Sequence, residues 1–144
     1  MTTCGEILDK LTILYKRIEV LKESKIYDNI ADLKKQEAYL LESLAKTITE
    51  IKNKKHPGNF KKHKIYDENT KADTANNLIS LIEKLKLYNE TLWKLEDDRR
   101  DKTKSDTERL NSADLVAVYN KMRNDTIDNI DEYIKYSLNL ILEI

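Results

Sequence analysis

Leucine and isoleucine recur near the start of the chain at alternating steps of four and three residues. The stripe consists of Ile7, Leu11, Leu14, Ile18 and Leu21. This spacing places the side chains on one narrow face of an α-helix, the kind of face that packs against a nearly parallel neighbour. Only two glycines and one proline interrupt the 144 residues, which favours long helices over turn-rich strands. The sequence therefore predicts an all-α protein.

Capping signals and further apolar stripes predict four long helices. In a capping box, a Ser or Thr and a Glu three residues later satisfy free backbone N–H groups at a helix start. Thr3 and Glu6 fit this pattern, and so do Ser105 and Glu108. We therefore expect helices that begin at these two places. Apolar residues at helical spacing predict two more, over residues 28–52 and 73–102.

One long connection, residues 53–73, separates the second expected helix from the third. From Lys52 to Lys64 it contains six lysines and two histidines and no acid. Such a segment could attract a polyanion or the phosphates of a ligand, but a solvated, mobile basic loop is the favoured explanation. The other connections are short. The sequence thus favours a single domain over residues 1–144, an antiparallel bundle of four helices.

The charges of the chain balance, with 26 Lys and Arg residues against 26 Asp and Glu residues. No global field draws it toward nucleic acid, which is not an expected partner. No run approaches the roughly 18 apolar residues of a membrane span, so no membrane association is expected. A single cysteine cannot form an intramolecular disulfide, and a signal peptide is not recognisable at the start. We expect a cytoplasmic protein.

Polar side chains interrupt the apolar stripe of the third expected helix. Asn89 and Glu96 occupy positions where the repeat of three and four residues calls for core residues. Trp93 and Arg100 each lie one turn from these positions. The four side chains therefore form a continuous ridge, and a ridge of this kind can line a pocket.

The fourth expected helix shows the same interruption. Asn120 and Arg123 lie on its apolar seam, and Asn124, one turn beyond Asn120, can share the inward edge. In an antiparallel pair of helices the two polar sets could face each other. A buried polar group costs about 1–3 kcal/mol unless it is bonded, so these groups form a network, meet water or bind a ligand. The predicted ligand-binding residues are Asn89, Trp93, Glu96, Arg100, Asn120, Arg123 and Asn124.

Two interpretations of these polar positions stay open. In the first, a buried network such as an ion pair between Glu96 and Arg123 fixes the register of the helices and performs no chemistry. In the second, the arginines hold a phosphate or carboxylate and the amides bind the polar edges of a ligand.

Carboxylates near the same positions could also bind a metal ion. Glu96 and Asp97 could hold Mg²⁺ or polarise a water molecule, with a weaker contribution from Asp125. Glu6 and Asp9 of the first helix are further weak candidates. Glu6 is already explained by its capping box, and a helical wheel directs Asp9 away from the apolar seam of that helix.

Two motifs resemble a family of small bacterial and phage helical proteins of unknown function. They are Asn89-x-x-Leu-Trp-x-x-Glu-Asp-x-x-Arg100 and Asn120-x-x-Arg-Asn-Asp125, and they are similar to the C-terminal half of that family. The segment from Gly5 to Leu14 is similar to the start of one of its branches. Members are often encoded near glycosyltransferases for surface polysaccharide, an association that implies no mechanism. The resemblance implies that the polar positions are the signature of the family.

Three functions are consistent with these observations. Paired arginines and amides beside an aromatic ring favour a binding module for a small anionic or phosphorylated ligand, of the nucleotide or nucleotide-sugar type. An alternative is a Mg²⁺-dependent phosphohydrolase resembling the all-α nucleotide pyrophosphatases, although Glu6-x-x-Asp9 is the only paired acidic motif of the expected kind. A third is a homo-oligomeric structural protein, favoured by outer tyrosines such as Tyr119 and by the apolar residues 138–144.

Overall fold

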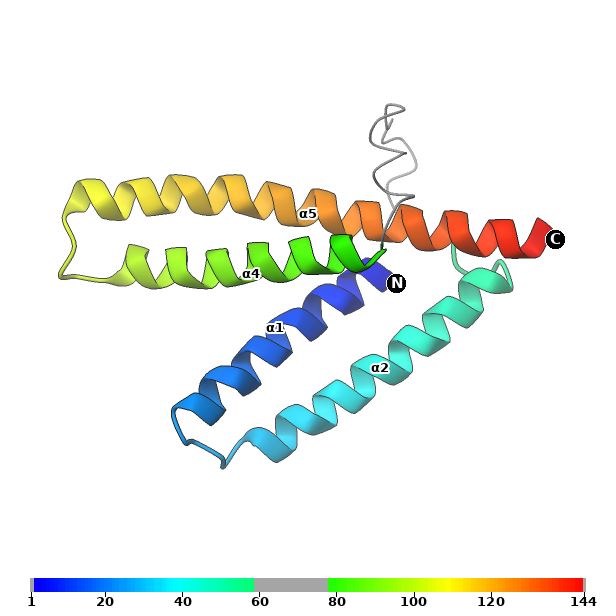
Figure 1. Ribbon diagram of the computed structural model, residues 1–144, viewed down its shortest axis with the longest axis horizontal. Helices are drawn as coiled ribbons and strands as arrows, with labels where there is room; N and C mark the ends of the chain where they lie inside the picture. The colour runs from blue at the N-terminus through cyan, green and yellow to red at the C-terminus, as the bar shows by residue number, and fades with distance from the viewer. Residues whose placement is uncertain (1, 59–77, 144) are drawn as a thin grey trace.

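The computed structural model describes residues 2–58 and 78–143, with side chains described as far as residue 138. Four helices make up this part of the chain: α1 (Cys4–Glu23), α2 (Ile30–Lys52), α4 (Leu78–Arg100) and α5 (Asp106–Glu143) (Figure 1). The described residues contain no strand, which confirms the all-α prediction. Residues 59–77, which include most of the expected basic loop, lie outside the described residues. No helix in the described ranges is both long and apolar enough to cross a bilayer.

Both predicted capping residues are found at helix starts. Thr3 is the N-cap of α1, and its hydroxyl oxygen accepts a hydrogen bond of 3.2 Å from the backbone N–H of Glu6. Directly before α5, the hydroxyl oxygen of Ser105 accepts a bond of 3.1 Å from the backbone N–H of Glu108. Each bond satisfies a donor that the helix itself cannot pair. The predicted starts of these two helices are therefore confirmed.

The helices form two hairpins that meet near the start of α1. α4 and α5, joined by residues 101–105, lie side by side and run in opposite directions (Figure 1). α1 and α2 form the second hairpin, which extends obliquely from the first (Figure 1). α5 is long enough, at 38 residues, to contact α4, α1 and α2. It is thus the element that joins the two hairpins.

The main core lies where the two hairpins meet. Its buried members come from all four helices: Cys4, Ile51, Leu81, Leu85, Ile127, Ile130 and Ile134. A smaller cluster of Leu14, Ile18 and Leu33 packs α1 against α2. The main core fixes the start of α1 against α4 and α5. The polar residues that follow on α1, Asp9 and Thr12, are therefore held close to the same two helices.

Candidate ligand pocket

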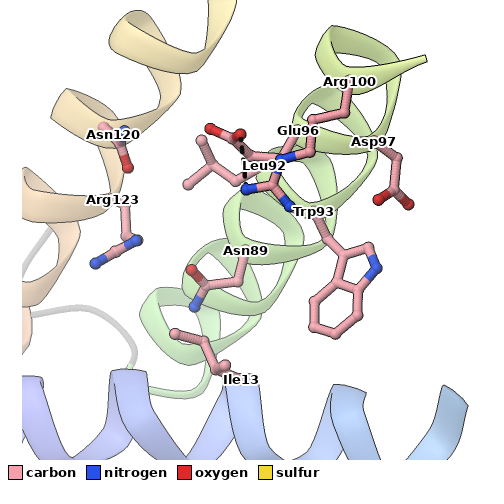
Figure 2. Close-up of a pocket in the computed structure, with 9 residues that line it drawn as sticks. All are labelled: Ile13, Asn89, Leu92, Trp93, Glu96, Asp97, Arg100, Asn120 and Arg123. Atoms are coloured by element: carbon pink, nitrogen blue, oxygen red, sulfur yellow. Dashed lines mark ion pairs between the residues drawn. The ribbon is translucent and has the colours of Figure 1, made fainter. Parts of the chain in front are cut away.

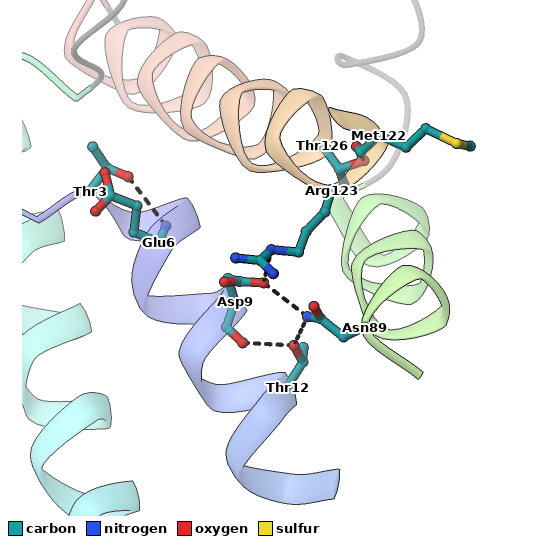
Figure 3. Close-up of polar contacts among 8 residues, drawn as sticks. All are labelled: Thr3, Glu6, Asp9, Thr12, Asn89, Met122, Arg123 and Thr126. Atoms are coloured by element: carbon teal, nitrogen blue, oxygen red, sulfur yellow. Dashed lines mark hydrogen bonds and ion pairs between the residues drawn. The ribbon is translucent and has the colours of Figure 1, made fainter. Parts of the chain in front are cut away.

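A buried carboxylate, that of Asp9, links α1 to both helices of the other hairpin. Asp9 is only 6 % exposed. The side-chain amide of Asn89 on α4 donates a hydrogen bond of 2.9 Å to its Oδ1, and Nε of Arg123 on α5 lies 3.4 Å from the same oxygen (Figure 3). The Asn89 amide also donates to the hydroxyl of Thr12 at 2.7 Å. Three helices are therefore joined at one side chain.

Asp9 points away from the apolar seam of α1, as the helical wheel predicts, but it is buried all the same. α1 contacts α2, α4 and α5, so it has a packed face beyond its apolar seam. Gly5 and Asp9 lie one turn apart on that second face. Because this face has few apolar side chains, the sequence pattern does not reveal that it is buried. The sequence nevertheless contained one indication of a buried acid. Arg123 lies on the apolar stripe of its helix, and an arginine buried there needs a partner of opposite charge.

A cavity of about 390 Å³ lies beside this junction (Figure 2). Its lining residues are Ile13, Asn89, Leu92, Trp93, Glu96, Asp97, Arg100, Asn120 and Arg123. Six of the seven predicted ligand-binding residues are among them. The seventh, Asn124, is exposed on α5 and does not line the cavity. Ile13 of α1, which sequence reasoning did not select, completes the wall.

The acidic and basic residues of the cavity pair differently from the predicted network. Glu96 accepts hydrogen bonds from Arg99 of its own helix, the shorter of them 2.7 Å, and lies 3.7 Å from Arg100. Arg123 pairs with Asp9 rather than with Glu96. The predicted pair between Glu96 and Arg123 is therefore wrong, because Glu96 has two arginines within one turn of its own helix. Arg100 keeps 72 % of its side chain exposed at the cavity.

The aromatic residue of the site lies toward one side of the cavity. Figure 2 shows the indole of Trp93 and the carboxylate of Asp97 directed away from Asn120 and Arg123. Trp93 is also among the exposed large side chains of the protein. The cavity thus has an amide and guanidinium side formed with α5, and an aromatic and acidic side formed by α4 alone.

The carboxylates named as weak or possible metal ligands are dispersed. Glu6 lies in the first turn of α1, whereas Asp9 is buried against Asn89. Glu96 is bonded to Arg99, and Asp97 lies on the opposite side of the cavity from α5. Asp125 lies on α5 and does not line the cavity. Within the described residues, no three His, Cys, Asp or Glu side chains gather closely enough to hold a metal ion.

A second buried acid, Asp131, anchors the start of α1 to α5. Its Oδ1 accepts a hydrogen bond of 2.6 Å from the backbone N–H of Gly5, 126 positions earlier in the chain. Burial raises the pKa of Asp131 to about 7, although hydrogen bonds from Thr3 and Gly5 favour the charged form. Burial, with the charge of Asp131, also raises the pKa of the Cys4 thiol to about 12. The thiol is therefore protonated and a poor nucleophile at neutral pH.

The raised pKa of Asp131 predicts a pH dependence of stability that Asp131→Asn removes. Above pH 4 the unfolded chain loses the proton, whereas the folded protein keeps it until about pH 7. The free energy of unfolding should therefore fall across this window as pH rises, by up to about 1.4 kcal/mol per pH unit. Asparagine keeps an oxygen acceptor for Gly5 but does not titrate. Urea unfolding at pH 5 and pH 7 measures the difference.

A control for this prediction is Asp114→Asn, which removes an exposed carboxylate from the same helix. This variant should keep the pH dependence of the original protein. An unchanged pH dependence in Asp131→Asn would contradict the assignment to Asp131.

Comparison with known proteins relates the hairpin of α4 and α5 to a family. Residues 79–143 match the family described as "Protein of unknown function (DUF4254)". This match covers α5 and nearly all of α4, and it supports the expected resemblance to an uncharacterised family. The segment from Gly5 to Leu14 lies outside it. No curated protein and no solved structure matches the chain.

Proposed function

We propose that the cavity between α1, α4 and α5 binds a small ligand with an anionic group, of the nucleotide or nucleotide-sugar type. One observation carries the proposal: six side chains selected for their place in the sequence pattern line one cavity of about 390 Å³. Small-ligand sites typically have volumes of about 300–1,000 Å³ and a few convergent polar groups. The cavity is therefore of a suitable size, and its polar groups come from two helices.

The charges of the lining limit the kind of ligand. Arg100 and Arg123 are balanced by Glu96 and Asp97. Such a wall favours a ligand that combines one anionic group with several uncharged polar groups, because a densely charged anion would meet the carboxylates as well. The amides of Asn89 and Asn120 can pair with those uncharged groups. A sugar or base attached to a phosphate has this composition.

Arg100 is the best anchor for the anionic group. Its neighbour Arg99 makes the short hydrogen bonds to Glu96, which leaves Arg100 with a pair of 3.7 Å to that carboxylate. A guanidinium carries five N–H donors, so most donors of Arg100 can serve a phosphate.

Arg123 links the same ligand to the junction at Asp9. Its Nε is buried and makes no hydrogen bond within the described residues, because the 3.4 Å approach to Asp9 lacks hydrogen-bond geometry. An anion in the cavity would compete with Asp9 for the guanidinium. On binding, the anion is therefore expected to pair with Arg123 of α5 and to weaken the ion pair between Arg123 and Asp9.

Arg100→Gln is expected to weaken ligand binding at least tenfold without changing the free energy of unfolding by more than about 0.5 kcal/mol. The loss corresponds to charge-assisted hydrogen bonds, which contribute about 1.5–3 kcal/mol. Calorimetry with nucleoside monophosphates, nucleoside diphosphates and nucleotide sugars first identifies the ligand, and the variant is then titrated with it. The fold of the variant is checked by thermal unfolding.

Lys94→Gln is the control for this experiment. It removes one positive charge from an exposed position of the same helix, and Lys94 neither lines the cavity nor forms an ion pair within the described residues. We expect it to bind the ligand within threefold of the original protein. Failure of every nucleotide and nucleotide sugar to bind, or equal losses in both variants, would contradict the proposal.

Self-association is a separate proposal with its own observation. Leu115, Val118 and Met122 are exposed and lie within two turns on one side of α5. Tyr119, which was expected at an outer position, instead contacts Tyr88 edge to face, with ring centroids 6.0 Å apart. Light scattering at micromolar concentration tests for a homo-oligomer, and Val118→Lys should shift any oligomer to a monomer.

A further inference from the structure

A groove between α1 and α2 contains a second set of polar residues. Two cavities of about 280 Å³ and 230 Å³ occur there, and both are lined by Lys10, Tyr39 and Leu40. The first also contains Arg17 and Gln36, and the second contains Ser43 and Lys46. We call the two cavities together the α1–α2 groove. None of its residues lines the cavity of the proposed function except Ile13.

The α1–α2 groove has an excess of positive charge. Its lining contains the cations Lys10, Arg17 and Lys46 and one acid, Glu50. In the cavity of the proposed function the charges balance, and a third cavity, between α1, α2 and α4, is lined by two lysines and three glutamates. The groove is therefore the place, among these cavities of the described chain, where an anion meets the most favourable charge.

The cations of the groove are available to a ligand. Within residues 2–58 and 78–138, none of Lys10, Arg17 and Lys46 forms an ion pair. His56 lies at one end, where its Nδ1 accepts a hydrogen bond from the backbone N–H of Gly58. Apart from this histidine, the ionisable side chains of the lining are the three cations, Glu50 and Tyr39.

The cations are arranged in a row. Lys10 and Arg17 are seven residues apart on α1, which corresponds to about 10 Å along the helix axis. α2 runs back beside α1, so Ser43 and Lys46 lie at the Lys10 end and Gln36 lies at the Arg17 end. A single phosphate cannot reach both ends. The arrangement suits an elongated anion with negative charge along its length.

We propose that the α1–α2 groove binds a linear chain of condensed phosphates. Ammonium and guanidinium groups along the groove would pair with successive phosphates, and the Ser43 hydroxyl and Gln36 amide would donate further hydrogen bonds. Two sources share this chemistry: inorganic polyphosphate and the phosphate chain of a dinucleoside polyphosphate. Tyr39, exposed between the two ends, offers a ring on which the base of the second kind of ligand can stack.

Calorimetry with the full chain at constant ionic strength tests the proposal. The probes are orthophosphate, tripolyphosphate and diadenosine tetraphosphate. Affinity should rise at least tenfold from orthophosphate to tripolyphosphate, because the longer ion reaches more than one cation. Tighter binding of diadenosine tetraphosphate than of tripolyphosphate supports the dinucleoside source, and equal or weaker binding supports the inorganic chain. An affinity that does not depend on chain length would overturn the proposal.

Two pairs of substitutions locate the site. Lys10→Gln with Lys46→Gln should weaken tripolyphosphate binding at least tenfold. The matched control is Lys22→Gln with Lys35→Gln, which removes the same charge from exposed positions of α1 and α2 outside the groove. Equal losses in the two double variants would show unspecific attraction and overturn the proposal. Arg100→Gln should leave tripolyphosphate binding unchanged, so this site and the proposed ligand cavity can fail independently.

Discussion

Gly5→Ala is expected to lower the free energy of unfolding by about 2–3 kcal/mol, the upper part of the range of about 1–3 kcal/mol that is typical of an overpacked contact. A Cβ at this position would overlap the backbone carbonyl oxygen of Ile127 and would lie 3.0 Å from Oδ1 of Asp131. A carbonyl inside α5 cannot rotate aside as a flexible side chain can. The start of α1 would have to move away from α5, and the 2.6 Å hydrogen bond from Gly5 to Asp131 would lengthen.

Helix propensity predicts the opposite change in the free energy of unfolding. Alanine is a better helix former than glycine by about 1 kcal/mol, so propensity alone predicts stabilisation. Urea unfolding of Gly5→Ala distinguishes the two. Glu19→Ala, at an exposed position of the same helix, serves as a control and should change stability by less than about 0.5 kcal/mol. A Gly5→Ala protein of unchanged or higher stability would show that α1 and α5 do not approach this closely.

Asp9→Ala is expected to cost about 2–3 kcal/mol as well. Removal of the carboxylate leaves Nε of Arg123 without its ion-pair partner and takes one hydrogen-bond acceptor from the amide of Asn89. Breaking a buried pair from one side costs about 3–5 kcal/mol, but 29 % of the Arg123 side chain is exposed and water recovers part of this. Asp9→Asn, which keeps an oxygen for Asn89, should cost about half as much. Chemical denaturation measures all three proteins.

A double-mutant cycle tests the assignment of the loss to Arg123. Asp9→Ala combined with Arg123→Ala should be less destabilising than the sum of the two single changes, by about 1 kcal/mol. Strictly additive losses would show that the 3.4 Å approach contributes nothing. Arg123→Ala also separates the two interpretations of the polar seam: loss of ligand binding with retained stability supports a binding site, and a large loss of stability supports a structural network.

The helices could be predicted from the sequence because their signals are local. Apolar steps of three and four residues define a face, and Thr3 and Ser105 cap backbone groups only three residues away. The convergence of the α4 and α5 polar residues on one cavity was foreseeable for a related reason. A connection of five residues, 101–105, leaves the two helices little choice but to lie side by side.

The contribution of α1 could not be read from the sequence in the same way. The face that it presents to α4 and α5 carries Gly5 and Asp9, a residue without a side chain and an acid that resembles a solvent-exposed residue. Burial of Asp9 depends on donors more than 75 positions away, on Asn89 and Arg123. Asp131 was not among the predicted site residues for a similar reason, because its partner is the backbone N–H of Gly5 rather than a side chain of complementary charge.

The contact between Gly5 and Asp131 also has a consequence for the order in which the protein forms during translation. Chains are synthesised from the N-terminus, so α1 and α2 leave the ribosome while α5 does not yet exist. Until residues 127–134 emerge, the start of α1 lacks its apolar partners on α5 and the acceptor for the backbone N–H of Gly5. Within the described residues, the early hairpin is held by the small cluster of Leu14, Ile18 and Leu33, with Leu21 and Leu40 packed against it. We therefore expect the start of α1 to dock only after α5 has been synthesised.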